Sequence, residues 1–113
     1  GGMVMGMGYA LMEDTIIEDG RTLTPNFSTY IIPTSIDAPD MDTVTCEVLE
    51  PSGPYGAKGV GEAVMVPIAP AITIGIDRAV GARVTHAPAT SERVYHAMRS
   101  RDGGRGVGEG STA

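Results

Sequence analysis

Apolar residues recur along the chain at spacings that predict three helices. Over residues 3–17 they share one face of period 3.6 while the acids lie elsewhere, which predicts an amphipathic helix. Ala, Ile and Val at helical spacing predict a second helix from about residue 68 to 80. A last helix is expected to begin at Thr90 or Ser91, whose hydroxyls can cap it, and to run to about Arg99.

Shorter β-prone runs between these helices predict several short strands. Three such runs stand out, of which the first alternates inside and outside most regularly: Thr43–Leu49, Phe27–Ile32 and Arg83–His86. Turn signals occur at Asp19-Gly20 and at Pro25-Asn26, and residues 33–42 read as a loop. The expected fold class is therefore α+β, with about three helices and several short strands.

Composition adds one feature to this pattern. The 113 residues include 16 glycines and 8 prolines, which indicates many turns and backbone used for something besides packing. Gly6 and Gly8 lie inside the first predicted helix, where each costs about 1 kcal/mol relative to Ala, so they predict close approach of another element or of a ligand. Lys58 is the single lysine beside seven arginines.

Charge and cysteine usage exclude several classes of protein. A formal net charge of −6 and the lack of a basic stripe argue against nucleic-acid binding. No apolar run is expected to approach the roughly 18–20 residues that span a membrane. A single cysteine, Cys46, fits a reducing compartment and hence a cytoplasmic location. Because the chain opens on Gly1-Gly2-Met3 and runs straight into an amphipathic pattern, we expect it to be a fragment of a longer protein.

The most unusual segment is the Gly- and Pro-rich stretch at residues 51–62. It does not match a P-loop, because Lys58 is flanked by Ala57 and Gly59. It does not match the dinucleotide fingerprint either, because its glycines follow the order Gly56-x-x-Gly59-x-Gly61, the reverse of G-x-G-x-x-G. Its glycines nevertheless leave backbone N–H groups uncovered toward an anionic ligand, and Lys58 adds a positive charge. Glu62 at its exit is a candidate general base. From the residues alone, a turn-rich connector with a solvated glutamate remains the alternative.

Gly56-Ala57-Lys58-Gly59-Val60-Gly61-Glu62 resembles the signature of the molybdenum-binding subunit of the xanthine dehydrogenase/aldehyde oxidase family. Other segments resemble the same family in the same order, so the resemblance covers about residues 1–98. These segments are Gly1–Leu11, Asp19–Arg21, Tyr30–Thr34, Pro67–Ile72 and Pro88–Val94.

The resemblance implies that residues 1–100 are a C-terminal part of a molybdopterin-binding domain, followed by a polar Gly-rich tail at 101–113. Glu62 would be the general base in hydroxylation of an aldehyde or N-heterocycle carbon with water-derived oxygen. The cofactor, molybdopterin, would be lined by Lys58, Gly59, Val60 and Gly61. Iron–sulfur clusters and FAD would lie on other domains or subunits, and the partners would be the rest of the molybdenum subunit, the iron–sulfur and flavin subunits and a small-molecule substrate.

The chain also departs from the family pattern. Met5 stands where the family often carries Gln, and most of the pterin-binding segments and all cluster-binding cysteines are absent, so the isolated fragment is expected to be inactive. A second Gly-Val-Gly-Glu at residues 106–109 lacks the preceding Gly-x-Lys and is read as a chance product. His86 and His96 are ten residues apart, and no metal-ligand set is predicted among the side chains. The alternative from another class is a non-catalytic interaction or scaffold module that keeps the fold.

Overall fold

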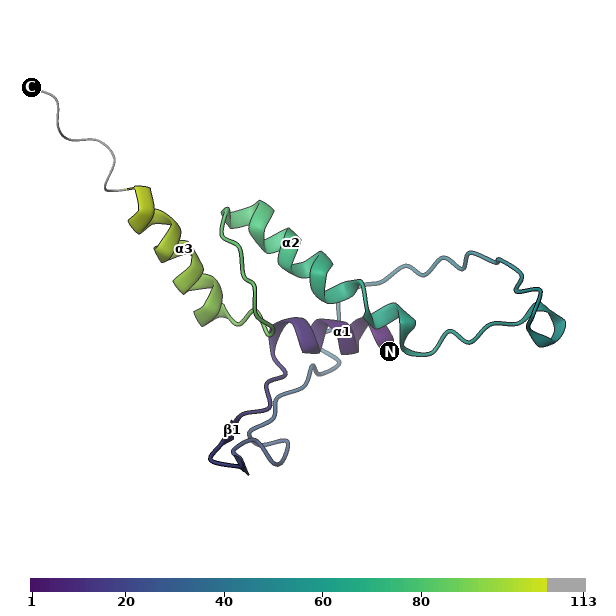
Figure 1. Cartoon of the computed structure of the whole chain (residues 1–113), viewed down its shortest axis with the longest axis horizontal. Helices are drawn as coiled ribbons and strands as arrows, with labels where there is room; N and C mark the ends of the chain where they lie inside the picture. The colour runs from purple at the N-terminus through teal and green to yellow at the C-terminus, as the bar shows by residue number, and fades with distance from the viewer. Residues whose placement is uncertain (106–113) are drawn as a thin grey trace, which may run out of the picture.

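A computed structural model describes residues 1–105 and consists of three helices, two short 3₁₀ turns and one small hairpin (Figure 1). In chain order the elements are α1 (Gly2–Leu11), β1 (Ile17–Glu18), β2 (Arg21–Thr22), η1 (Pro54–Gly56), η2 (Glu62–Met65), α2 (Ile68–Val80) and α3 (Ser91–Arg105). The α+β class with about three helices is confirmed.

The first helix is shorter than its sequence pattern. It ends at Leu11 rather than at residue 17, because the Glu13 N–H donates to the Gly8 carbonyl, which already accepts the regular bond from Met12, and so leaves the helical ladder. The β-branched run that follows enters the hairpin instead, in which Ile17 pairs with Thr22. The predicted turn at residues 19–20 is confirmed: Asp19 has φ 47° and Gly20 φ 75°, the positive values that a tight hairpin turn requires.

The second helix and the start of the third follow the prediction. α2 spans Ile68–Val80 and closes on Gly81, which has φ 64° and donates its N–H to the Asp77 carbonyl at 2.7 Å. α3 begins at Ser91, and Thr90 caps it by accepting the Arg93 N–H on Oγ1 at 3.3 Å. The expected end at Arg99 is wrong, because the helix continues through Arg105.

The predicted strands at Thr43–Leu49, Phe27–Ile32 and Arg83–His86 are wrong as strands. Within residues 1–105 the hairpin of β1 and β2 is the only sheet, so none of the three runs has a neighbouring strand to complete its backbone hydrogen bonds. Residues 27–29 form a turn closed by the Tyr30 N–H, which donates to the Asn26 carbonyl at 2.8 Å. The loop at 33–42 is confirmed.

The packed part of the molecule, called the body below, consists of α1, η2 and α2. The glycines of α1 make this packing possible. A Cβ at Gly6 would lie 2.6 Å from Ile68 Cβ of α2, and one at Gly8 would lie 2.7 Å from Pro33 Cδ. The expectation that Gly6 and Gly8 permit close approach is thus confirmed, and what approaches is protein.

The start of α3 is tied to the end of α1. The Ala89 N–H donates to the Ala10 carbonyl at 2.6 Å. Arg93 donates to the Asp14 carboxylate at 3.0 Å and to the Pro88 carbonyl at 2.8 Å. The buried apolar side chains of the described residues are all small: Ala10 and Ala89 at this junction, and Ala82 just after α2.

Beyond the body, the chain is extended. Its radius of gyration is 20.0 Å, against about 13 Å for a compact domain of this length. Residues 41–60 form a long excursion, called the arm below, that leaves the body and returns to it at η2 (Figure 1). Apolar side chains on the arm are largely uncovered, for example Val44 at 86% and Leu49 at 79% exposure. The described chain therefore buries little of its apolar surface against itself.

One stretch, Glu62–Val80, passes a membrane-span test by length and composition, with 19 residues and a mean hydropathy of 1.5. The expectation that no apolar run approaches this length is corrected accordingly. The stretch is not one regular helix, since it joins η2 to α2 through a turn at residues 66–67. The 13 residues of α2 rise about 20 Å, less than the roughly 30 Å of a hydrocarbon core.

Candidate functional site

The Gly-rich segment is the returning half of the arm. Its tip is closed by η1, where the Glu50 N–H donates to the Gly56 carbonyl at 3.1 Å. The Ser52 hydroxyl donates to Glu50 Oε1 at 2.7 Å, and this bond, with a second from the Ser52 N–H, lowers the pKa of the Glu50 carboxyl. These local bonds fix the tip without help from the body.

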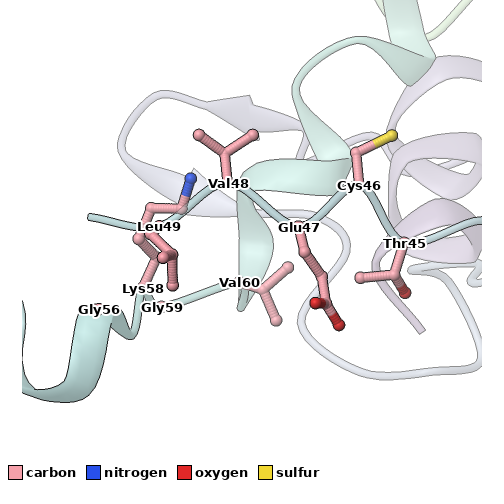
Figure 2. A pocket seen from close by; sticks show the side chains of 9 residues that line it. All are labelled: Thr45, Cys46, Glu47, Val48, Leu49, Gly56, Lys58, Gly59 and Val60. Atoms are coloured by element: carbon pink, nitrogen blue, oxygen red, sulfur yellow. The ribbon is translucent and has the colours of Figure 1, made fainter. Parts of the chain in front are cut away.

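The two legs of the arm enclose an open groove of about 620 Å³ (Figure 2). The outgoing leg contributes residues 45–49, and the returning leg contributes Gly56, Lys58, Gly59 and Val60. Along the outgoing leg the side chains alternate: Cys46 and Val48 point to one side, whereas Thr45 and Glu47 point to the other (Figure 2). The alternation that suggested a strand is thus present in the side chains although the backbone has no pairing partner.

Three of the five predicted site residues lie together in this groove: Lys58, Gly59 and Val60. Gly61 and Glu62 are not among its lining residues; they lie where the arm rejoins the body. Glu62 is the first residue of η2 and is exposed. Within the described part of the chain, Glu62 and Lys58 make no ion pair and no side-chain hydrogen bond, so both charges remain available to a ligand.

The glycines of the segment differ from those of α1. A Cβ built at Gly59 or at Gly61 meets no atom within 4 Å. The backbone on either side of Val60 is therefore uncovered by the chain's own side chains. Uncovered backbone N–H groups next to a lysine can donate hydrogen bonds to the anionic groups of a large cofactor. The residues present thus fit a group such as the phosphate-bearing pterin that the sequence suggests.

Two features were not predicted from the sequence, one in the arm and one beside α3. The outgoing leg, residues 45–49, faces the Gly-rich segment across the groove. The two legs face each other because the tip at η1 folds the chain back. His86 and His96 line one small cavity of about 280 Å³ together with Arg83 and Arg93, although ten residues separate the two histidines. His96 Nε2 lies 3.8 Å from Glu92 Oε1.

Among the described residues no group of three His, Cys, Asp or Glu side chains has the arrangement of a metal site. Cys46 is free and exposed on the outgoing leg of the arm. The second Gly-Val-Gly-Glu, at residues 106–109, lies outside the residues that the structure describes.

Comparison with known proteins supports the resemblance that the motifs suggested. Residues 1–39 match the family model of a molybdopterin cofactor-binding domain. The chain is 38% identical over 97 residues to a xanthine dehydrogenase molybdenum-binding subunit of Escherichia coli O157:H7, covering 84% of this chain and 13% of that protein. It is 34% identical over 97 residues to the aldehyde oxidoreductase molybdenum-binding subunit PaoC of E. coli K12, covering 83% of this chain and 13% of that protein.

A solved structure agrees with the sequence relatives. Quinoline 2-oxidoreductase from Pseudomonas putida 86 superposes with a TM-score of 0.78 at 28% identity, covering 87% of this chain and 13% of that chain. The predicted resemblance is confirmed: the chain corresponds to a segment of the molybdenum-binding subunits of the xanthine dehydrogenase/aldehyde oxidase family. It spans about 13% of the length of the curated relatives that it matches.

Proposed function

We propose that this chain is part of a molybdenum hydroxylase that hydroxylates an aldehyde or an N-heterocycle carbon, with Glu62 as the general base. The observation that carries the proposal is the position of Glu62: an exposed carboxylate without an ion pair in the described chain, directly after Gly61, where the backbone is open. The similarity to molybdenum-binding subunits over most of the chain supports the same reaction class.

The residues divide into holding and proton-accepting roles. The Lys58 ammonium and the uncovered backbone of Gly59, Val60 and Gly61 hold the cofactor's anionic groups. When bound, molybdopterin supplies the redox centre that takes up the two electrons released by hydroxylation. A Glu62 carboxylate oxygen accepts the proton of the water-derived hydroxyl that attacks the substrate carbon. Because Glu62 starts a turn packed on α1, its carboxylate is held on the body rather than on the extended arm.

The proposal includes partners and location. The rest of the molybdenum subunit covers the apolar arm, and iron–sulfur and flavin groups on other domains or subunits remove electrons. The free cysteine fits a cytoplasmic location. Since the buried apolar side chains of the described residues are three alanines, the 113 residues alone are expected to bind no cofactor and to be inactive.

The test is Glu62→Gln in the full-length protein that carries this chain. Gln keeps the size of the side chain but cannot accept the proton, so turnover is expected to fall by roughly 100-fold or more. Molybdenum and pterin content, measured in the same preparations, should stay at the parent level. Near-parent turnover with full cofactor content would contradict the proposal and favour a non-catalytic interaction module.

A further inference from the structure

We infer that Gly2 is a positioning residue for Glu62, because its missing side chain lets the turn that carries Glu62 lie directly on the first turn of α1. The inference rests on the proposed function of Glu62 as the general base. Gly2 acts through its packing neighbour, Val64, and not on the reacting atoms.

The contact is specific in its atoms. A Cβ built at Gly2 would overlap Val64 Cγ2, and the next nearest atoms, Val64 Cβ at 3.6 Å and the Gly61 carbonyl oxygen at 3.8 Å, are at ordinary distances. All of these atoms belong to residues that flank Glu62 along the chain: Gly61 precedes it and Val64 follows two residues later. Glu62 therefore lies in the chain between two residues, Gly61 and Val64, that are both close to Gly2.

The turn has little freedom to absorb an added methyl group. Val64 carries two methyl groups on Cβ, so of its two other χ1 rotamers one returns a methyl group to the same space and only one clears it. With Val64 in the rotamer that it adopts in the structure, the backbone of η2 must move by on the order of 1 Å to restore normal contact distances. A displacement of that size at a catalytic group costs about 100-fold in rate. A side chain added at Gly2, a residue that does not take part in the reaction, is therefore expected to lower the catalytic rate.

The experiment compares four variants of the full-length protein: Gly2→Ala, Val64→Ala, the double variant, and Gly1→Ala as the matched control. A Cβ at Gly1 meets nothing within 4 Å, so Gly1→Ala should leave turnover at the parent level. Gly2→Ala should lower kcat by about 100-fold with little change in KM. Because Val64→Ala removes the overlapping Cγ2 atom, the double variant should recover kcat to within about tenfold of the parent, a coupling that independent sites would not show.

Two further measurements separate positioning from general damage. Molybdenum and pterin content per protein should be unchanged in Gly2→Ala, and its crystal structure should show Glu62 displaced relative to α1. Parent-level kcat in Gly2→Ala, loss of cofactor from it, or failure of Val64→Ala to restore the double variant would each overturn the inference. If Glu62→Gln is itself fully active, the proposed function fails instead, which distinguishes the two outcomes.

Discussion

The body and the arm use glycine in opposite ways. In α1 the glycines are contact points: a side chain at Gly2 or Gly6 would run into Val64 or Ile68. In the returning leg of the arm, Gly59 and Gly61 meet no atom of the chain. The same residue type therefore allows two elements to meet in one region and leaves the backbone uncovered in the other. The amino-acid composition does not distinguish these glycines. Only the atoms near each glycine show whether it allows two elements to pack or leaves the backbone accessible.

The largest effect on stability is expected at Gly6, where α1 packs on α2. Gly6→Ala gains about 1 kcal/mol of helix propensity, but its Cβ would lie 2.6 Å from Ile68 Cβ, an atom next to the α2 backbone that cannot move cheaply. Overpacking costs roughly 1–3 kcal/mol, and close to the backbone we expect a net loss of about 2 kcal/mol in the free energy of unfolding. Denaturant unfolding of the full-length protein measures this loss.

The control for this prediction is Gly75→Ala in α2, where an added Cβ meets nothing within 4 Å. That variant should gain about 0.5–1 kcal/mol from propensity. Equal effects of the two substitutions would show that Gly6 of α1 is not a contact point.

A smaller effect is expected where the body meets α3. Arg93→Gln removes the bond to the Asp14 carboxylate and the bond to the Pro88 carbonyl. The side chains of Arg93 and Asp14 are 41% and 38% exposed, so solvent screening limits the loss to about 1 kcal/mol in the free energy of unfolding.

The matched control is Arg83→Gln, because Arg83 lies 4.0 Å from Asp77 and its side chain is 81% exposed. This surface pair should contribute almost nothing. A loss as large in Arg83→Gln as in Arg93→Gln would mean that charge alone, and not the link between α1 and α3, accounts for the effect.

The smallest effect concerns the tip of the arm. The Ser52 hydroxyl is the main cause of the lowered pKa of Glu50, so Ser52→Ala should raise that pKa toward its ordinary value of 4.5. A lowered pKa means that the stabilisation of the tip is present above the unfolded-state value and is lost as the pH falls through the folded-state value. Carboxyl-¹³C glutamate NMR would follow the titration, with Ser35→Ala as the control; an unchanged Glu50 titration in Ser52→Ala would contradict this assignment.

The sequence predicted local features well and pairing poorly. The bounds of α2, the cap of α3 and the turn at Asp19-Gly20 depend on neighbouring residues alone, and they were predicted correctly. The run at Thr43–Leu49 has strand-like alternation, but a strand also needs a partner, which the described chain does not provide. The predicted end of α1 was wrong because the apolar period of 3.6 continues past Leu11, whereas the Glu13 N–H turns back to the Gly8 carbonyl.

The candidate site was predictable in its residues but not in its arrangement. The motif around Lys58 and Glu62 could be read directly, and the roles of these residues remain predictions. That Lys58, Gly59 and Val60 lie in a groove with residues 45–49, while Glu62 belongs to the body, depends on how the tip folds the arm back. The packing of Val64 on Gly2 joins residues that no local pattern relates.

The bond between Arg93 and Asp14 joins residues 79 positions apart and has a consequence for synthesis on the ribosome. At about 5–20 residues per second, roughly 4 to 16 seconds pass between translation of the two residues. During that interval the end of α1 has emerged while its partners Ala89 and Arg93 have not yet been made. The nascent chain therefore leaves the Ala10 carbonyl and the Asp14 carboxylate without these partners until the start of α3 has been made.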